Sequence, residues 1–194
     1  MPKKRYKIYL FRHGRTTFNE KGIFTGWKDP PLTLGGRKDA LVIARKLKNK
    51  KFQVAIQTRL ERSKDTLKPV LKYHPECKKI ITDNRMIERS YGVLAGTSHE
   101  AFIKRYGEKG YEEIHRGYNV RVPKGESFKD VEKRVKSFIK WLKMYIKKNK
   151  VNIAISAHGN SIRLFRKIWE KASKEEAVSW FIPYDKLFTY RVKI

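Results

Sequence analysis

The chain has a single cysteine, Cys77, and no hydrophobic run that approaches the roughly 18–20 residues of a membrane-spanning helix. One cysteine cannot form an internal disulfide, so a disulfide scaffold is excluded and a reducing, cytoplasmic location is expected. The basic stretch MPKKRYK at the N-terminus is not followed by an apolar region, so no secretory signal is expected. The length of 194 residues and the 40% hydrophobic content indicate one folded domain, residues 1–194, with a substantial core.

Three common catalytic patterns are also missing. The sequence has no GxxxxGK[ST] loop for nucleotides, no GxSxG turn for a serine nucleophile, and no HxH, HExxH or Cys/His spacing for a metal. His74, His99 and His115 have no carboxylate cluster near them in the sequence. Nucleotide hydrolysis, serine hydrolysis and metal-dependent hydrolysis are therefore disfavoured.

Acidic residues are scarce, because 19 Asp and Glu stand against 47 Lys and Arg, for a net charge of +28. Such a balance fits binding to nucleic acid, to an anionic membrane surface or to a small polyanionic substrate. It also fits a lysine-rich surface without a specific role, since much of the lysine lies at solvent-facing positions of stretches such as 46–51 and 133–150. Composition alone leaves these alternatives open.

Apolar runs alternate with segments of helical periodicity, which predicts an α/β fold. Strands are expected at 6–11, 54–57, 79–83, 151–156 and 187–192. Helices are expected at 35–50, around 60–67 with a break near Pro69, at 98–106, from a capping box of Ser127 and Asp130 onward, at 161–172, and after Ser173. Residues 85–126 otherwise lack clean periodicity and are expected to form a cap over the sheet.

Three of the expected strands run into polar residues. The first is followed by RHG (12–14), the second by TRLER (58–62) and the fourth by AHGN (157–160). In open α/β sheets, ligands bind beyond the carboxyl ends of the strands, where the strand order reverses. Gly14 and Gly159 are expected to allow sharp turns that bring backbone N–H groups near an anion. Two imidazoles and several guanidinium groups should therefore meet in one crevice.

Two histidines with clustered arginines favour phosphoryl transfer. An unprotonated imidazole is a good nucleophile near neutral pH, and arginines bind phosphate oxygens bidentately and offset their charge. Each residue alone has an ordinary structural explanation: a histidine after a strand is usually a core or loop residue. Arg62 alone would be a surface cation and Glu88 a salt-bridge partner.

The order of the segments makes the catalytic interpretation preferable. The segments are FRHGRTTFN (11–19), FTGWKDPPLTLGG (24–36), TRLERS (58–63), ERSYGVLAG (88–96) and AHGNSIR (157–163). Together they resemble the histidine phosphatase superfamily and, within it, the cofactor-dependent phosphoglycerate mutases, over almost the whole chain. The resemblance implies a three-layer sandwich with a mostly parallel central sheet flanked by helices, and a small cap insertion.

The resemblance also implies roles for individual residues. His13 would be the nucleophile that becomes phosphohistidine, and His158 would stabilise the transferring phosphoryl group. Glu88 would protonate the leaving oxygen and later activate the incoming hydroxyl. The phosphate would be clamped by Arg12 and Arg62. The remaining substrate-binding residues that the resemblance implies are Asn19, Thr25, Gly26, Arg89, Tyr91, His99, His115, Arg116, Gly159 and Asn160.

The activity implied by the resemblance is interconversion of 3-phosphoglycerate and 2-phosphoglycerate in glycolysis and gluconeogenesis. It would be primed by 2,3-bisphosphoglycerate and would need no metal. The expected partners are small phosphorylated substrates, with neither a specific nucleic acid nor a membrane. The sequence leaves open whether the protein forms a homo-oligomer.

Two positions depart from the family pattern. His99 stands where the family usually has a lysine, and His115 where it has the first of two arginines. Permanent cations are thus replaced by imidazoles, which are mostly neutral near pH 7. If these imidazoles face the ligand, affinity for bisphosphoglycerate should improve as the pH falls through roughly 6.5.

Two alternatives to a mutase follow. One is a phosphomonoester phosphatase, in which water takes the phosphoryl group; it is favoured by the two histidines and by the end of the chain at Ile194, where longer mutases continue into a tail. The other is a basic nucleic-acid-binding protein with a vestigial site. Against the latter, the sequence has no aromatic-basic RNA motif.

Overall fold

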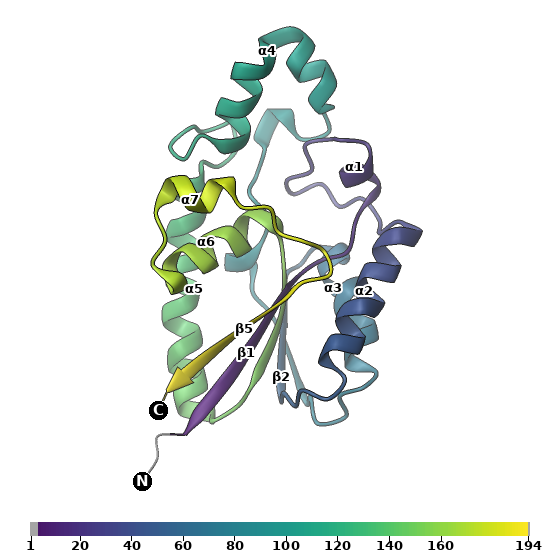
Figure 1. Cartoon of the computed structure of the whole chain (residues 1–194), viewed down its shortest axis with the longest axis vertical. Helices are drawn as coiled ribbons and strands as arrows, with labels where there is room; N and C mark the ends of the chain where they lie inside the picture. Colours follow the sequence, from purple (N-terminus) through teal and green to yellow (C-terminus); the bar gives the residue numbers. More distant parts are fainter. Residues whose placement is uncertain (1–3, 194) are drawn as a thin grey trace.

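The computed structural model describes residues 4–193 as an α/β fold (Figure 1). Its elements in chain order are β1 (Arg5–Arg12), α1 (Thr17–Glu20), α2 (Leu34–Leu47), β2 (Val54–Gln57), α3 (Glu61–Leu71), β3 (Lys79–Thr82), the short 3₁₀ turns η1 (Asn84–Met86) and η2 (Gly92–Leu94), α4 (His99–Arg116), α5 (Phe128–Asn149), β4 (Ile153–Ala157), α6 (Gly159–Glu170), α7 (Lys174–Ser179) and β5 (Leu187–Lys193). Within this part of the chain, no helix is long and apolar enough to cross a membrane.

The five strands form one sheet in the order β3-β2-β4-β1-β5. Four of them run parallel, and only β5 lies antiparallel, on the edge beside β1. The register pairs Arg12 with Ala157, and the backbone N–H of His13 donates to Ala157 O at 3.0 Å. The carboxyl ends of β1 and β4 therefore lie next to each other, as the sequence predicts.

Helices cover both faces of the sheet. Ile8 and Leu10 of β1 pack on the side of α5 and α6, whereas Tyr9 and Phe11 pack on the side of α2 and α3. This alternation follows from the two-residue period of a strand, and Figure 1 shows the green α5 and blue α2 on opposite sides of the strands. The predicted three-layer architecture is confirmed.

The expected elements are found, with three corrections. The predicted break at Pro69 is wrong, because α3 continues through it and ends two residues later, at Leu71. The helix expected at 98–106 runs on to Arg116 across a kink at Gly107, whose φ of 74° is accessible to glycine. The short α1 was not expected; a capping box of Thr16 and Asn19 closes its first turn.

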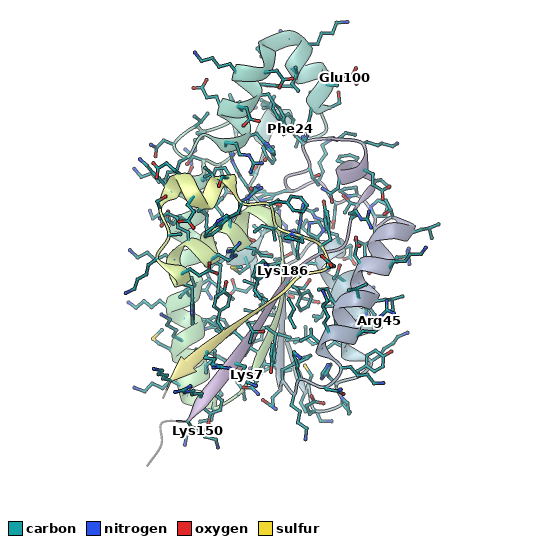
Figure 2. All side chains as sticks on the ribbon, in the orientation of Figure 1. Lys7, Phe24, Arg45, Glu100, Lys150 and Lys186 are labelled. Atoms are coloured by element: carbon teal, nitrogen blue, oxygen red, sulfur yellow. The ribbon has the colours of Figure 1, made fainter. Side chains whose placement is uncertain are left out.

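Residues 85–126 lie beyond the carboxyl ends of the strands, with α4 uppermost in Figure 1. Around α4, Tyr91, Phe102 and Val122 pack with Phe24 in a small cluster. Figure 2 shows Phe24 beneath α4, between it and the rest of the fold. The region is also tied to the main fold, because Met86 belongs to the core cluster on the side of α5 and Arg134 of α5 pairs with Glu126.

Candidate active site

A cavity lies between the carboxyl ends of β1 and β4 and the region of α4. Its walls include most of the residues predicted to bind or react: Arg12, His13, Asn19, Thr25, Gly26, Arg62, Glu88, Tyr91, His99, His115, Arg116, Gly159 and Asn160. The walls also include residues that the sequence did not predict, among them Phe18, Ile23, Phe24, Arg163, Phe181 and Tyr184.

His13 is buried directly after β1, and its Nδ1 lies 2.7 Å from the carbonyl oxygen of Gly14. A carbonyl can only accept a hydrogen bond, so Nδ1 carries the proton and the lone pair lies on Nε2. The pKa of His13 is well below its usual value, chiefly because of burial and then because of the positive charges of Arg62 and Arg12. The imidazole is therefore a neutral nucleophile at physiological pH.

Gly14 does not itself offer an N–H group to an anion. Its N–H donates to Thr66 Oγ1 at 2.9 Å. A Cβ at Gly14 would lie 2.1 Å from the carbonyl oxygen of Gly36. The glycine is needed because the loop after β1 packs directly against the first turn of α2.

His158 lies at the end of β4 and caps the first turn of α6. Its ring centre is 5.0 Å from that of His13, and its Nε2 is 2.8 Å from Thr58 Oγ1. Burial, followed by the charge of Arg62, holds the pKa of His158 well below its usual value. The sequence marks Thr58 only as part of the segment 58–63, and no local pattern indicates its contact with His158, because the two residues are 100 positions apart.

Arg62 is 1% exposed, and it is fixed by the carbonyl oxygens of Lys28 at 2.7 Å and Gly26 at 2.8 Å. Within residues 4–193, three buried nitrogens near His13 have no hydrogen-bond partner: Arg12 Nε, Arg62 Nε and His158 Nδ1. Buried polar groups are nearly always satisfied, so exceptions call for an explanation. The two unpartnered guanidinium N–H groups beside a nucleophilic imidazole suit the oxygens of a phosphoryl group.

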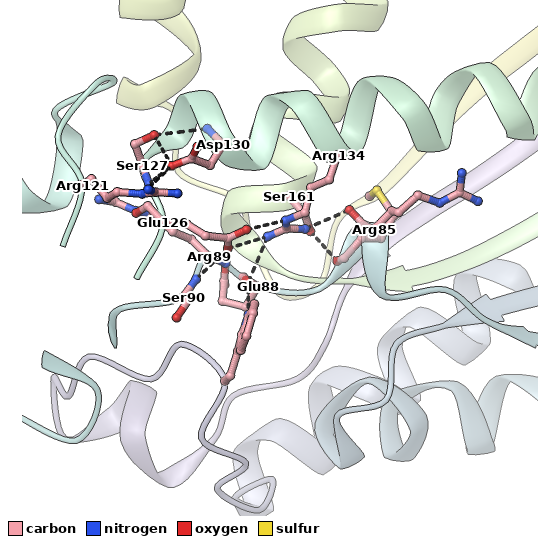
Figure 3. A network of polar contacts seen from close by, with 12 residues as sticks. Arg85, Glu88, Arg89, Ser90, Arg121, Glu126, Ser127, Asp130, Arg134 and Ser161 are labelled. Carbon is pink, nitrogen blue, oxygen red and sulfur yellow. Dashed lines mark hydrogen bonds and ion pairs between the residues drawn. The ribbon is translucent and has the colours of Figure 1, made fainter. Parts of the chain in front are cut away.

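Glu88 lines the cavity together with His13, whereas His158 lies behind the lining residues, with one ligand atom within 4.8 Å of both. Glu88 Oε1 accepts from the backbone N–H of Arg89 at 2.8 Å and of Asn160, in the first turn of α6, at 3.1 Å. Its backbone carbonyl accepts from Arg134, in the network that Figure 3 shows. In the described part of the chain, Oε2 makes no hydrogen bond, which leaves it available for proton transfer.

His13, Glu88 and His158 form a group that sequence spacing did not reveal. One ligand atom of each lies within 4.8 Å of the others, which is close enough to hold a metal ion. His13 Nδ1 and Glu88 Oε1 are engaged by backbone groups, which leaves His13 Nε2 and Glu88 Oε2 as the atoms that face a ligand. The guanidinium groups of Arg12 and Arg62 beside them disfavour a cation and favour an anion. Metal-free chemistry stays a prediction.

Arg89 does not line the cavity. Its guanidinium is completely buried and donates to the carbonyl oxygens of Glu126, Ile114 and Val120 at 2.7–3.0 Å. The side chain thus joins three segments beneath the cap, and the substrate contact expected for it is not found. The position of Arg89 next to Glu88 in the sequence does not show whether its side chain points into the cavity or towards the cap loops.

His99 and His115 both line the cavity at the cap end. The ring of Tyr111 stacks on the ring of His115, with 5.0 Å between the ring centres. Burial and the charge of Arg116 lower the pKa of His115 to about 3. Burial also lowers the pKa of His99. His115 is therefore neutral near pH 6.5, and the expected gain of charge at that pH is wrong for it in the free protein.

Arg163 was missed, although a signal for it existed. It lies three residues after Asn160 on α6, so both side chains share one helix face, and its Nη1 donates to Asn160 Oδ1. Tyr184 was also missed, and no local motif marks it. Its ring lies over the guanidinium of Arg12, with Cζ 3.9 Å from the ring centre.

Comparison with known proteins agrees with this geometry. The family model of the histidine phosphatase superfamily (branch 1) matches residues 8–191. A 2,3-bisphosphoglycerate-dependent phosphoglycerate mutase of Bartonella henselae is 33% identical over 176 residues, which are 89% of this chain and 85% of the relative. The chain belongs to the histidine phosphatase superfamily, and it is an enzyme of that superfamily.

Solved structures share the fold. A phosphoglycerate mutase from Bacillus anthracis str. Sterne superposes with a TM-score of 0.81 at 20% identity, covering 99% of this chain and 92% of that one. An alpha-ribazole phosphatase from Shigella flexneri gives the same TM-score, 0.81, at 22% identity, covering 94% and 89%. At these identities the likeness concerns the fold alone, and the fold is common to mutases and phosphatases.

Proposed function

We propose that the protein is a 2,3-bisphosphoglycerate-dependent phosphoglycerate mutase that interconverts 3- and 2-phosphoglycerate through a phosphohistidine. The observation that carries the proposal is the neutral, buried His13, with its Nε2 lone pair free, between two arginines and opposite Glu88. The likeness to the Bartonella henselae mutase, at 33% identity, supports the choice of this reaction within the superfamily.

The site's own residues account for each step. His13 Nε2 attacks the phosphorus of a bound phosphomonoester, the bond between phosphorus and the leaving oxygen breaks, and Glu88 supplies the proton to that oxygen. In the return step, Glu88 takes the proton of a substrate hydroxyl, which attacks the phosphohistidine and restores neutral His13. Arg12, Arg62 and His158 offset the charge on the transferring oxygens in both directions.

Bound bisphosphoglycerate would supply the phosphoryl group that primes His13. The unpartnered nitrogens at Arg12, Arg62 and His158 fit one phosphoryl group. At the cap end, Arg116 and Arg163 are the cations available to the second anionic group, because His99 and His115 are neutral. The residues present therefore fit the primer, with fewer cations at the distal end than the family pattern has.

That shortage supports a second candidate, a phosphomonoester phosphatase. With a weakly held substrate hydroxyl, water would take its place in the return step, and free phosphate would be released. A vestigial site in a nucleic-acid-binding protein is the least supported alternative, since the groups needed for transfer lie together in one cavity.

One assay separates these candidates. 3-Phosphoglycerate is incubated with and without bisphosphoglycerate, and 2-phosphoglycerate and free phosphate are measured together. Formation of 2-phosphoglycerate that depends on the primer and exceeds phosphate release supports the mutase. Phosphate release without 2-phosphoglycerate would replace it with the phosphatase, and neither product would contradict both.

A further inference from the structure

The segment 178–184 consists of the last two residues of α7 and the chain that leads from it towards β5, and it passes across the end of the sheet, as the yellow chain in Figure 1 shows. We call this segment the strap. Three arginines that line the cavity donate to alternate carbonyl groups of the strap. The pairs are Arg116 Nη1 with Val178 O at 2.6 Å, Arg163 Nε with Trp180 O at 2.7 Å, and Arg12 Nη1 with Ile182 O at 2.8 Å.

These arginines come from three different elements, the end of α4, α6 and the end of β1. An arginine side chain has many rotamers, and its planar group recognises phosphate well only in a fixed orientation. One hydrogen bond to a carbonyl restricts the guanidinium but leaves rotation about that bond. A second contact is needed to fix the plane.

Arg12 has such a second contact, because the ring of Tyr184 lies over its guanidinium at 3.9 Å. Gly159 lies beside it as well: a Cβ at that position would be 3.5 Å from Arg12 Nε, which is an ordinary van der Waals contact. The ring of Tyr184 also lies edge-on to His13, with 6.4 Å between ring centres. Tyr184 thus borders both the nucleophile and the arginine beside it.

We propose that Tyr184 is a positioning residue for phosphoryl transfer: its aromatic ring, together with Ile182 O, fixes the plane of Arg12 so that the remaining N–H groups face the phosphoryl oxygens. The inference rests on the proposed chemistry at His13. Donors that are already oriented lower the barrier more than they strengthen binding of the ground state. Burial raises the pKa of the Tyr184 hydroxyl, so the ring stays uncharged at neutral pH.

The test compares Tyr184→Phe, which keeps the ring, with Tyr184→Leu, which removes it. A cation–π contact contributes about 0.5–2 kcal/mol, so Tyr184→Leu should lower kcat about 2- to 30-fold, with a smaller change in KM. Tyr184→Phe should stay within about twofold of the wild type. Asp185→Ala, at the adjacent exposed residue, is the matched control for general disturbance of the strap, and it should leave kcat unchanged.

A double-mutant cycle with Arg12→Lys shows whether Tyr184 acts through Arg12. In the Arg12→Lys background, Tyr184→Leu should cause little further loss. If the losses of kcat from Arg12→Lys and Tyr184→Leu multiply independently, the inference is overturned. An equal loss of kcat in Tyr184→Phe would also overturn it, because the hydroxyl itself would then contact the ligand. A loss in Asp185→Ala as large as that in Tyr184→Leu would overturn it too.

Failure of the inference and failure of the proposed function give different results. A wild type without turnover on any phosphomonoester contradicts the proposed function. Binding of orthovanadate, a five-coordinate mimic of the transferring phosphoryl group, is measured by calorimetry and then decides the inference without turnover: it should be weaker in Tyr184→Leu than in Tyr184→Phe. Equal affinity in the two variants would overturn the positioning role.

Discussion

The two ends of the cavity are built differently. At the phosphoryl end, His13 and His158 follow neighbouring parallel strands, and Arg62 is locked by two carbonyl groups. At the cap end, His99 and His115 lie on α4, which is kinked at Gly107 and rests on a separate small cluster. The positions of the residues at the phosphoryl end are therefore fixed by the sheet, whereas those of the residues at the cap end depend on the packing of a single helix.

The charges differ in the same way. The phosphoryl end places two guanidinium groups beside an imidazole that is kept neutral, which suits attack on a phosphoryl group. At the cap end, two further imidazoles are neutral, and Arg116 and Arg163 donate part of their N–H groups to the strap. Under the proposed function, the phosphoryl end would therefore specify the chemistry and the cap end the choice among substrates.

The largest effect should come from the nucleophile at the phosphoryl end. His13→Ala should lower turnover by at least about 10³-fold, as removal of a nucleophile does in other enzymes. Incubation of the wild type with bisphosphoglycerate should give an acid-labile, base-stable phosphoryl adduct, located on His13 by peptide mapping. An adduct on His158 would mean that the two histidines have exchanged roles.

Loss of the proton donor should have the next largest effect. Glu88→Gln keeps the shape and the acceptor for Asn160 N–H but cannot transfer a proton, so turnover should fall roughly 10²–10⁴-fold. Substrate binding should change much less. Glu100→Gln, on the exposed side of α4, removes the same charge outside the cavity and serves as the control. Near-normal turnover in Glu88→Gln would place the proton transfer elsewhere.

The cap end can be changed towards the family pattern. His99→Lys with His115→Arg adds two cations to the cavity, and each charged contact with a desolvated anion contributes a few kcal/mol. Binding of bisphosphoglycerate at pH 8, measured by calorimetry, should tighten at least about tenfold, and the ratio of 2-phosphoglycerate to free phosphate should rise. Unchanged affinity would show that the distal anionic group does not reach these residues.

The lowered pKa values of His13, His158 and His115 also affect stability. Below pH 6.5 these histidines gain protons in the unfolded chain but not in the folded one, so the free energy of unfolding should fall as the pH falls. Each contributes a slope of up to about 1.4 kcal/mol per pH unit. His115→Gln should therefore make denaturant-measured stability less dependent on pH between 7 and 5. An unchanged dependence of the free energy of unfolding on pH would contradict the low pKa of His115.

Metal removal should have the smallest effect. Exhaustive treatment with EDTA is expected to leave turnover unchanged, because the two arginines supply the positive charge at the phosphoryl end. The group of His13, Glu88 and His158 makes this a meaningful test. Activity lost on chelation and restored by one divalent ion would refute the metal-free mechanism.

Much of the phosphoryl end could be predicted from the sequence. The apolar strands, the RHG and AHGN segments that follow them and the capping box of Ser127 and Asp130 are local patterns, and the structure confirms them. Parallel pairing of β1 and β4 then places His13 near His158, because strand ends on the same edge of a sheet meet. These residues need only the correct strand order to come together.

The sequence by itself determined the strands, the helix starts and the residues at the strand ends, because each depends on neighbours within a few positions. Only the tertiary structure decided that Arg89 joins the cap loops, that His115 is held neutral, and that Tyr184 covers Arg12. Arg12 and its acceptor Ile182 are 170 residues apart, and no local pattern reports such a contact. The direction of a long side chain and the burial of an imidazole follow from packing between distant segments, which exists only once the chain has folded.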